Sequence, residues 1–269
     1  MDKYTIFISS DTLDLEQTLF CGQCFRWKKT GCNSYEGFSG GRFAKATQET
    51  GGIKLVCSRE KDIPYWENYF DTSTDYAALC ERFSEDETLK KAVSAAKGIH
   101  ILRQEPFETI ISFIISQNNN IPRISGIISR LCECFGEETD GGYAFPTSKV
   151  LARLEESDLA PLRAGFRNRY ILDAAKKTAG KEVDLERLKS LDNDSARAEL
   201  MTIVGVGRKV ADCSLLFGFN RLDVCPVDVW IKRVLEKYYP DGLPECAKGY
   251  EGLAQQFLFQ YERKLSAGD

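Results

Sequence analysis

The sequence predicts an α+β protein in which an N-terminal antiparallel β-sheet domain precedes a mostly α-helical domain. Three observations predict this order. Short alternating apolar runs separated by glycine-rich turns fill the first sixty residues, a pattern typical of an antiparallel meander. From Tyr65 onward the apolar period lengthens to that of helices. Two later helical segments are joined by a tight glycine-rich hairpin at residues 203–207.

Length, composition and charge limit the possible classes. A chain of 269 residues can bury a substantial core in one or two domains, and we place the domains at residues 1–97 and 98–269. No apolar run is long enough to span a bilayer, and the N-terminus lacks a signal-peptide pattern, so we expect a cytoplasmic protein. In such a chain the ten cysteines should stay reduced. With a net charge of −4, any contact with nucleic acid must come from a local basic face.

The predicted strands lie early in the chain, after an amphipathic segment at residues 13–19. They are Phe25–Trp27, Tyr35–Phe38, Arg42–Thr47 and Ile53–Cys57. The stretch Cys21-Gly22-Gln23-Cys24-Phe25-Arg26-Trp27 joins the amphipathic segment to the first strand. Taken alone, Gly22 predicts only the start of a strand, and Phe25 and Trp27 are expected in the core.

A helix apolar nearly all round is predicted after Pro106, which suits a first helical position, and this helix should be buried. Asn118-Asn119-Asn120 end it, and the next helix starts near Pro122. Asparagines commonly serve only as caps and turns. His100, the single histidine, lies between two isoleucines and is expected to be structural. A histidine-based metal site is not expected, because no second histidine exists.

The hairpin at residues 203–207 carries Gly205 and Gly207, which permit positive φ and close backbone approach. The helix that follows presents unpaired N–H groups and a positive dipole end, a natural seat for a phosphate. Lys209 lies in its first turn, where the dipole disfavours a positive charge, so its amine should lose a proton more easily. Cys213, four residues on, shares the face of Lys209.

Three more segments carry candidate residues. Asp228 in PVDV is expected to be the N-cap of the next helix. The last helix is predicted over residues 246–264. Its Gln255 and Phe259 are four residues apart and share one face, whereas Phe257 is expected in the core. Between residues 166 and 170, aromatic and basic residues alternate, a composition suited to wedging into a duplex and pairing with phosphates.

The hairpin glycines, Lys209 and Asp228 together resemble the helix-hairpin-helix, Gly/Pro-Asp signature of a DNA glycosylase superfamily. Within it, GVGRKVADC followed by PVDV, together with GQCFRW and the asparagine triplet, resembles the 8-oxoguanine DNA glycosylases. The match extends over nearly the whole chain and suggests a bacterial member. It implies a bifunctional enzyme that flips out and excises 8-oxoguanine, preferably opposite cytosine, through a lysine Schiff base, and then nicks the strand by β-elimination.

The resemblance also implies roles for single residues. Lys209 would be the nucleophile, and Asp228 would stabilise positive charge on the sugar. The carbonyl of Gly22 would accept a hydrogen bond from the N7–H group that 8-oxoguanine has and guanine lacks. The flipped base would also be held by Cys213, Gln255 and Phe259.

On the opposite strand, the resemblance implies that Asn118 enters the gap left by the extruded nucleotide. Arg123 and Arg167 would read the orphaned cytosine, and Phe166 would wedge beside it. Gly205 and Gly207 would bring the hairpin against the DNA backbone. The expected partner is double-stranded DNA containing 8-oxoguanine, bound by a monomer without a membrane.

No catalytic metal and no cofactor are expected. The four-cysteine iron–sulfur pattern of the endonuclease III branch is missing, since Cys246 stands alone near the C-terminus. The resemblance does imply a structural cation, held by the backbone carbonyls of Met201, Ile203 and Val206. One departure concerns Trp230, which stands where the animal enzymes have a histidine that contacts phosphate.

Two alternatives remain at this stage. One is a sister glycosylase of the superfamily for another oxidised or alkylated base; the GQCFRW block argues against it. The other is a DNA-binding module without activity that uses the hairpin only to hold phosphate. Such a module would need neither Asp228 nor the pocket residues Gln255 and Phe259.

Overall fold

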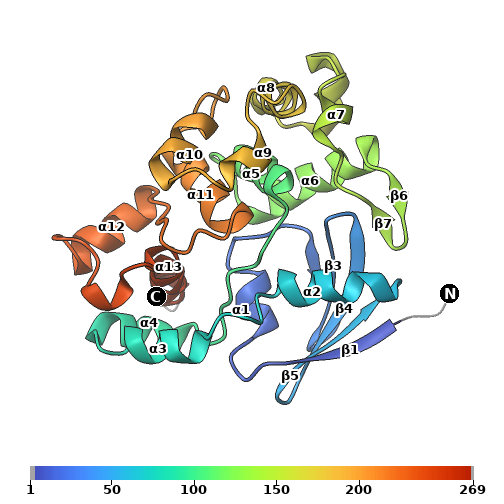
Figure 1. Cartoon of the computed structure of the whole chain (residues 1–269). Coiled ribbons are helices and arrows are strands. Elements are labelled where there is room, and N and C mark those ends of the chain that lie inside the picture. The colour runs from blue at the N-terminus through green and yellow to red at the C-terminus, as the bar shows by residue number, and fades with distance from the viewer. Residues whose placement is uncertain (1–3, 268–269) are drawn as a thin grey trace.

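The computed structural model describes residues 4–267, and its fold is α+β as predicted (Figure 1). A five-stranded antiparallel sheet from the first sixty residues lies at one side of the molecule, and the helices fill the remainder. In the part of the chain described, no helix is long and apolar enough to cross a membrane.

The sheet has the strand order β1-β5-β4-β3-β2. Its strands are β1 Tyr4–Ser9, β2 Trp27–Lys29, β3 Ser34–Ser39, β4 Arg42–Glu49 and β5 Gly52–Cys57. The turn between β3 and β4 uses Gly40 and Gly41, both with positive φ (55° and 70°), as tight hairpins of this kind require. Strand β1 was not predicted. It lies at the sheet edge, and apolar Phe7 on it is 52% exposed, so its apolar residues do not all mark one buried face.

An aromatic cluster forms the centre of the sheet domain. Trp27 of β2 packs edge-on against Trp66 with ring centroids 5.9 Å apart, and its indole N–H donates to the Tyr69 hydroxyl at 2.9 Å. A Cβ at Gly37, the residue of β3 paired with Trp27, would lie 2.2 Å from the indole. Glycine is therefore required where the strand passes over the ring. As predicted, Phe25 and Trp27 are buried.

The remaining elements are helices and one short hairpin. The α-helices are α1 Leu15–Leu19, α2 Ile63–Tyr69, α3 Tyr76–Phe83, α4 Glu87–Ala95, α5 Pro106–Ser116, α6 Ile121–Phe135, α7 Ser148–Leu151, α8 Arg167–Ala179, α9 Leu185–Leu188, α10 Asn193–Leu200, α11 Arg208–Gly218, α12 Val229–Tyr238 and α13 Glu251–Ala267. Strands β6 Glu138–Thr139 and β7 Gly142–Tyr143 form the hairpin, and 3₁₀ turns lie at Glu60–Asp62, Glu156–Leu162 and Glu245–Ala247. Helix α5 begins at Pro106 and is buried over most of its length, as predicted.

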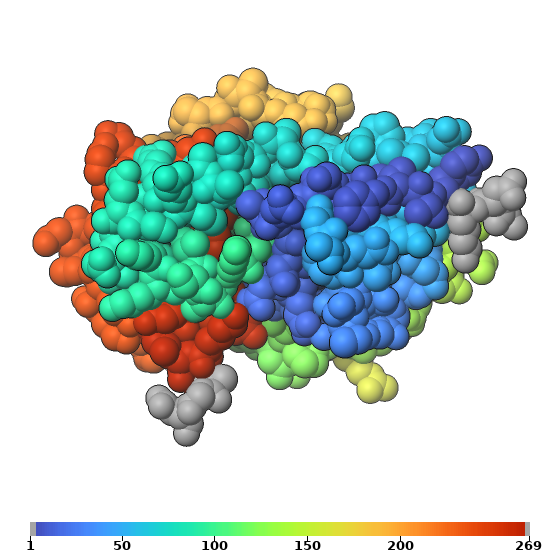
Figure 2. Space-filling model, turned by 90° about the horizontal axis from the view of Figure 1, so that it is seen from below, coloured from blue at the N-terminus to red at the C-terminus, as the bar shows by residue number. Residues whose placement is uncertain are grey.

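The molecule has two hydrophobic cores. One lies between the sheet and helices α1 and α2, and the other joins the remaining helices around α5, α11 and α13. Helices α3 and α4 belong to the second core, because α4 packs on α13 and Phe83 of α3 meets Phe257 edge-on at 6.2 Å. Figure 2 shows α3 and α4 beside the sheet on one face, with the C-terminal segment emerging next to them. The boundary near residue 97 stays a prediction.

The last helix differs from the prediction at its start. It spans Glu251–Ala267, whereas residues 246–264 were expected. Cys246 lies in a 3₁₀ turn, and Gly249, with a φ of +81°, separates that turn from the helix. Residues 255–259 still lie within one continuous helix, so the spacing on which their prediction rested is unchanged.

His100 is structural, as predicted. It is 1% exposed and stacks on Tyr76 with ring centroids 3.7 Å apart. Its Nδ1–H donates to the carbonyl of Phe70, and its Nε2 accepts from the Thr12 hydroxyl, both at 3.1 Å. Burial lowers the pKa of His100 to about 4, so the ring stays neutral near neutral pH.

This histidine predicts a pH-dependent stability. Between pH 4 and 6.5 the unfolded chain binds one proton more than the folded chain, so the stability that neutral His100 contributes is present above pH 6.5 and is lost as the pH falls to 4. The full effect is about 3 kcal/mol. Urea unfolding of wild type and His100→Gln across this range should show the steeper decline in wild type; parallel profiles would refute the assignment.

Candidate active site

A cavity of about 200 Å³ lies where the loop before β2 meets α5, α11, α13 and the start of α12. All six residues predicted to act on the base or the sugar line it: Gly22, Lys209, Cys213, Asp228, Gln255 and Phe259. They come from four separate segments of the chain. The fold therefore brings the predicted catalytic and base-binding residues together.

Lys209 and Asp228 line both this pocket and a second, larger cleft. The cleft has a volume of about 560 Å³ and is also lined by Asn118 and Trp230. Asp228 is the N-cap of α12, as predicted, and its Oδ1 accepts from the Ile231 N–H at 2.8 Å. Its Oδ2 accepts no hydrogen bond from the described residues. The amine and one carboxylate oxygen are thus both available at the pocket.

Apolar groups form the floor of the pocket. The rings of Phe113 and Phe217 stack with centroids 5.4 Å apart, and Phe25 meets Phe113 edge-on at 5.9 Å. The amine of Lys209 lies 5.2 Å from the centroid of Phe113. Burial raises the pKa of the Cys213 thiol above its ordinary value, and the charge of Lys209 offsets this only in part. Cys213 therefore lines the pocket as an uncharged thiol at neutral pH.

The loop with Gly22 is held from both sides. Gly22 has a φ of +92°, and a Cβ there would meet no atom within 4 Å, so its backbone conformation favours glycine although the space is open. Gln23 is 1% exposed. Its Nε2 donates to the carbonyls of Thr18 and His100, both at 2.8 Å, and its Oε1 accepts from the Leu102 N–H at 2.9 Å. Sequence reasoning gave Gln23 no role.

Helix α13 presents Gln255 and Phe259 to the pocket. Gln255 is 5% exposed, and its amide makes no hydrogen bond within residues 4–267, so it is free to bind a ligand. Phe257 lies in the core, as expected.

The hairpin between α10 and α11 depends on one glycine. Gly205 has a φ of +81°, and a Cβ there would lie 2.3 Å from the Tyr170 ring of α8. Gly207 does not adopt the positive φ that both hairpin glycines were expected to permit. It is the N-cap of α11 with a φ of −94°, which any residue can adopt, and a Cβ at this position would meet no atom within 4 Å. The hairpin is also anchored to α8, because the Val204 N–H donates to Asp173 at 2.7 Å.

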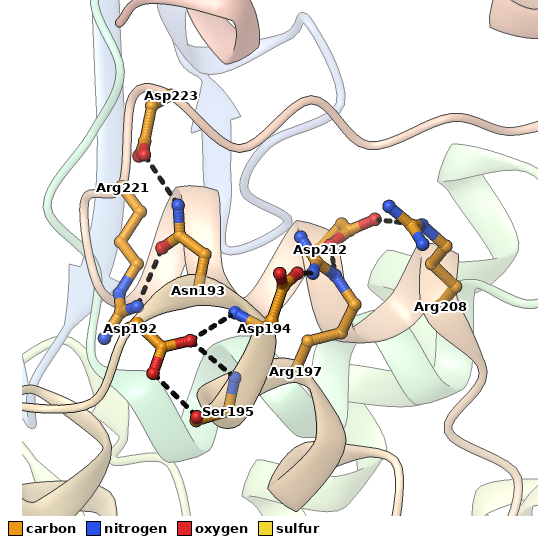
Figure 3. A network of polar contacts seen from close by, with 9 residues as sticks. All are labelled: Asp192, Asn193, Asp194, Ser195, Arg197, Arg208, Asp212, Arg221 and Asp223. Carbon is orange, nitrogen blue, oxygen red and sulfur yellow. Dashed lines mark hydrogen bonds and ion pairs between the residues drawn. The ribbon is translucent and has the colours of Figure 1, made fainter.

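A polar network joins α10 to α11 (Figure 3). Asp212 of α11 is buried, and its Oδ1 accepts from Arg197 Nε at 2.5 Å. The same carboxylate lies 3.6 Å from Nε of Arg208, the first residue of α11, whose side chain is mostly exposed. Arg197 also pairs with Asp194. The network fixes the two helices and holds Arg208 at the surface beside Lys209.

The three asparagines have separate roles. The Asn119 amide donates to the Ile115 carbonyl at 2.8 Å and closes α5, while Asn120 is the N-cap of α6 and accepts from the Arg123 N–H at 3.0 Å. The cap-and-turn interpretation is therefore correct for these two. Asn118, with a φ of +51°, is exposed and lines the larger cleft.

The predicted readers of the opposite strand gather beside this turn. Phe166 is 49% exposed, whereas Arg167 is 4% exposed and 4.4 Å from the Phe166 ring. Arg167 Nε donates to the carbonyl of Gln117 and Nη1 to that of Ala164, both at 3.0 Å, and Nη2 also donates to the Gln117 carbonyl. Burial first, and then the charge of exposed Arg123, lower the pKa of Arg167. Through its bond to Gln117, Arg167 thus also holds the backbone next to Asn118 in place, a structural role that the sequence did not indicate.

Arg233 is a candidate that sequence reasoning missed. It lies on α12, is exposed, and lines the larger cleft with Lys209 and Trp230. It forms no ion pair with any residue in the described part of the chain. The available signal was its position one turn into the helix that Asp228 was predicted to cap. Trp230, 37% exposed, lies at the same cleft.

The described residues, 4–267, contain no group of three or more His, Cys, Asp or Glu side chains that could hold a metal. The ten cysteines are free thiols.

The fold and this site define a DNA repair protein of the HhH-GPD class. Residues 111–243 match the HhH-GPD superfamily of base excision DNA repair proteins, and residues 5–110 match the N-terminal domain of 8-oxoguanine DNA glycosylase. The chain belongs to the 8-oxoguanine DNA glycosylase family.

Individual relatives agree with this membership. A probable N-glycosylase/DNA lyase of Methanothermobacter thermautotrophicus is 32% identical over 240 residues, which are 77% of this chain and 75% of that protein. The N-glycosylase/DNA lyase of Saccharomyces cerevisiae is 40% identical over 53% of this chain, and the match spans only 42% of the yeast protein. The structure of Clostridium acetobutylicum 8-oxoguanine glycosylase/lyase, in complex with double-stranded DNA containing cytosine opposite 8-oxoguanine, superimposes with a TM-score of 0.88. That protein is 33% identical, with 97% of this chain and 98% of the other covered.

The two hairpin glycines should respond differently to substitution. Gly205→Ala forces a side chain into a positive-φ position and against Tyr170, so it should lower the free energy of unfolding by about 2 kcal/mol. Gly207→Ala meets neither obstacle and should change it by less than about 0.5 kcal/mol. Chemical denaturation of both variants checks this; equal losses would contradict it.

Proposed function

We propose that this protein excises 8-oxoguanine from double-stranded DNA, preferably opposite cytosine, and nicks the strand at the resulting abasic site. One observation carries the proposal: Lys209 and Asp228 line both the pocket that holds the predicted base-binding residues and the neighbouring larger cleft. A flipped nucleotide could place its base in the pocket and its sugar beside these two residues. The description of the Clostridium relative as an 8-oxoguanine glycosylase/lyase supports the same substrate.

DNA would be held chiefly by its backbone. The N–H groups at the start of α11 are unobstructed at Gly207 and suit a phosphate. Arg208, next to Lys209 in the sequence, and Arg233, which lines the cleft with Lys209, are both exposed and would add charge-assisted contacts. This local basic region would compensate for the negative net charge of the chain.

The damaged base would be recognised in the pocket by few polar groups. The Gly22 carbonyl would accept from N7–H of 8-oxoguanine, whereas the N7 lone pair of guanine would leave that carbonyl unpaired. The free amide of Gln255 would bond the Watson–Crick edge. Phe259 and the neutral Cys213 thiol would hold the two faces of the base.

The chemistry would follow from Lys209 and Asp228. The neutral amine of Lys209 attacks C1′ while the C1′–N9 bond breaks and the base leaves with its electrons. The negative charge of Asp228 stabilises the positive charge that develops on the sugar. The departing base takes up a proton that the attached amine loses. The nitrogen lone pair then breaks the C1′–O4′ bond, and O4′ takes up a proton, so the sugar ring opens and a protonated Schiff base forms at C1′. The Schiff base acidifies C2′, and loss of that proton expels the 3′ phosphate by β-elimination.

The opposite strand would be read beside the Asn118 turn. Asn118 would fill the gap left by the flipped nucleotide, and Phe166 would wedge beside the orphaned base. Arg123 and the remaining N–H groups of Arg167 would donate to the acceptors of cytosine.

We further propose a monomer that acts in the cytoplasm, at the nucleoid of a bacterium, and needs no cofactor for catalysis. A structural cation bridging to a DNA phosphate would be held by the carbonyls of Met201, Ile203 and Val206. The Ile203 carbonyl accepts one hydrogen bond, from the Val206 N–H at 3.0 Å, and keeps a second lone pair for such an ion.

Borohydride trapping on a duplex with 8-oxoguanine opposite cytosine tests the nucleophile. Wild type should form a covalent complex, and Lys209→Gln should form none, because the Schiff base requires the amine. Lys232→Gln, a matched change at an exposed lysine of α12, should trap like wild type. Trapping by Lys209→Gln would refute the mechanism. If wild type neither traps nor releases the base opposite any of the four bases, the substrate is another damaged base.

Replacing Arg123 should relax the choice of opposite base. Loss of one good contact to cytosine corresponds to about 1–3 kcal/mol, so Arg123→Ala should lower the ratio of excision rates opposite cytosine and opposite adenine by about 5- to 150-fold. Arg153→Ala, at an exposed arginine outside both cavities, serves as the control. An unchanged ratio in Arg123→Ala would remove this residue from the reading of cytosine.

A further inference from the structure

Gln256 makes a buried contact between the two ends of the chain. It lies on α13 next to Gln255 and is 3% exposed. Its Nε2 donates to the carbonyl of Cys21 at 3.0 Å, across 235 residues of sequence. Cys21 immediately precedes Gly22, so the last helix is bonded directly to the loop that lines the pocket.

The carbonyls around Gly22 follow a simple pattern. The Cys21 carbonyl is taken by Gln256, and the Gln23 carbonyl accepts from Nε2 of Gln104 at 2.8 Å. Among the described residues, none donates to the Gly22 carbonyl between them. Since Gly22 has no side chain to pack, the direction of its carbonyl depends on how its two neighbouring carbonyls are held.

Gln256 also shares a rigid element with the base-binding groups. Gln255 and Phe259 project into the pocket from the same helix, and a helix fixes the relative positions of residues one to three places apart. By contrast, Lys209 and Asp228 lie on α11 and at the start of α12. A change at Gln256 should therefore reach base recognition before it reaches the chemistry on the sugar.

We infer that Gln256 is a positioning residue for base recognition: its amide fixes the Cys21–Gly22 peptide relative to Gln255 and Phe259, and so aims the Gly22 carbonyl at N7–H of the damaged base. The inference rests on the proposed function. Gln256 also lines the pocket, but its amide nitrogen is bonded to the Cys21 carbonyl, so we assign it to positioning. A bond that served only stability would instead affect every activity of the protein equally.

The test compares two substrates for one variant. Gln256→Met keeps the length of the side chain and removes the donor. Single-turnover excision of 8-oxoguanine opposite cytosine should fall at least tenfold, while nicking of a preformed abasic site, which carries no base, should stay within twofold of wild type. Equal losses on both substrates, or no loss on either, would overturn the inference.

Gln260→Met is the matched control. Gln260 is a buried glutamine one turn further along α13, and among residues 4–267 its amide oxygen accepts only from Arg263, within the same helix, at 3.0 Å. Both activities should remain within twofold of wild type. Should Gln256→Met fail to fold, Gln256→Ala provides a second variant, since its side chain has no group that can donate to the Cys21 carbonyl. The same selective loss of excision is expected, and its absence would count against the inference.

Hydrogen exchange separates this inference from the substrate assignment. In the free protein, Gln256→Met should speed amide exchange of residues 21–25 at least tenfold, and Gln260→Met should not. If wild type fails to excise 8-oxoguanine, the proposed function is wrong, yet the faster exchange would still support the positioning role. Unchanged exchange in this loop would overturn it.

Discussion

The buried amide of Gln23 is the interaction on which the pocket depends. A buried amide is stable only when its polar atoms are paired, and those of Gln23 bond to Thr18, His100 and Leu102. Thr18 lies in α1, and His100 and Leu102 lie in the segment between α4 and α5, so the bonds hold the loop before β2 against both. The pocket therefore forms where this loop meets the helices. Gly22 reaches it from the sheet side, and Lys209 from the helical side.

The features predicted from the sequence are those with a local cause. The cap at Asp228, the start of α5 at Pro106 and the turn at Gly205 depend on residues within one or two helical turns, and all three are confirmed. The contacts of Gln23 with His100 and of Arg167 with Gln117 could not be predicted, because these partners lie 50 or more residues away along the chain. The docking of α3 and α4 on α13 could not be predicted for the same reason, because these helices are far apart in the sequence.

Three glycines at the site look alike in the sequence but are needed for different reasons. Gly205 combines a positive φ with direct contact against Tyr170, so a side chain there is excluded twice. Gly22 has a positive φ but open space, and the space is the pocket itself. Gly207 has neither constraint, which leaves close approach by an outside group as the remaining use for a bare backbone. The structure thus separates folding from binding among residues that the sequence groups together.

On helix α11, the carboxylate of Asp212 does not pair with the amine of Lys209. Asp212 lies between Lys209 and Cys213 in the sequence, yet it is buried against α10 and paired with Arg197. A carboxylate committed in this way does not compete for Lys209, which forms no ion pair with the described residues and lies near the Phe113 ring. Asp228, on another helix, is then the carboxylate that faces the cleft. Lys209 thus lies beside the Phe113 ring with no carboxylate paired to it, and the network in Figure 3 contributes to this arrangement by pairing Asp212 with Arg197.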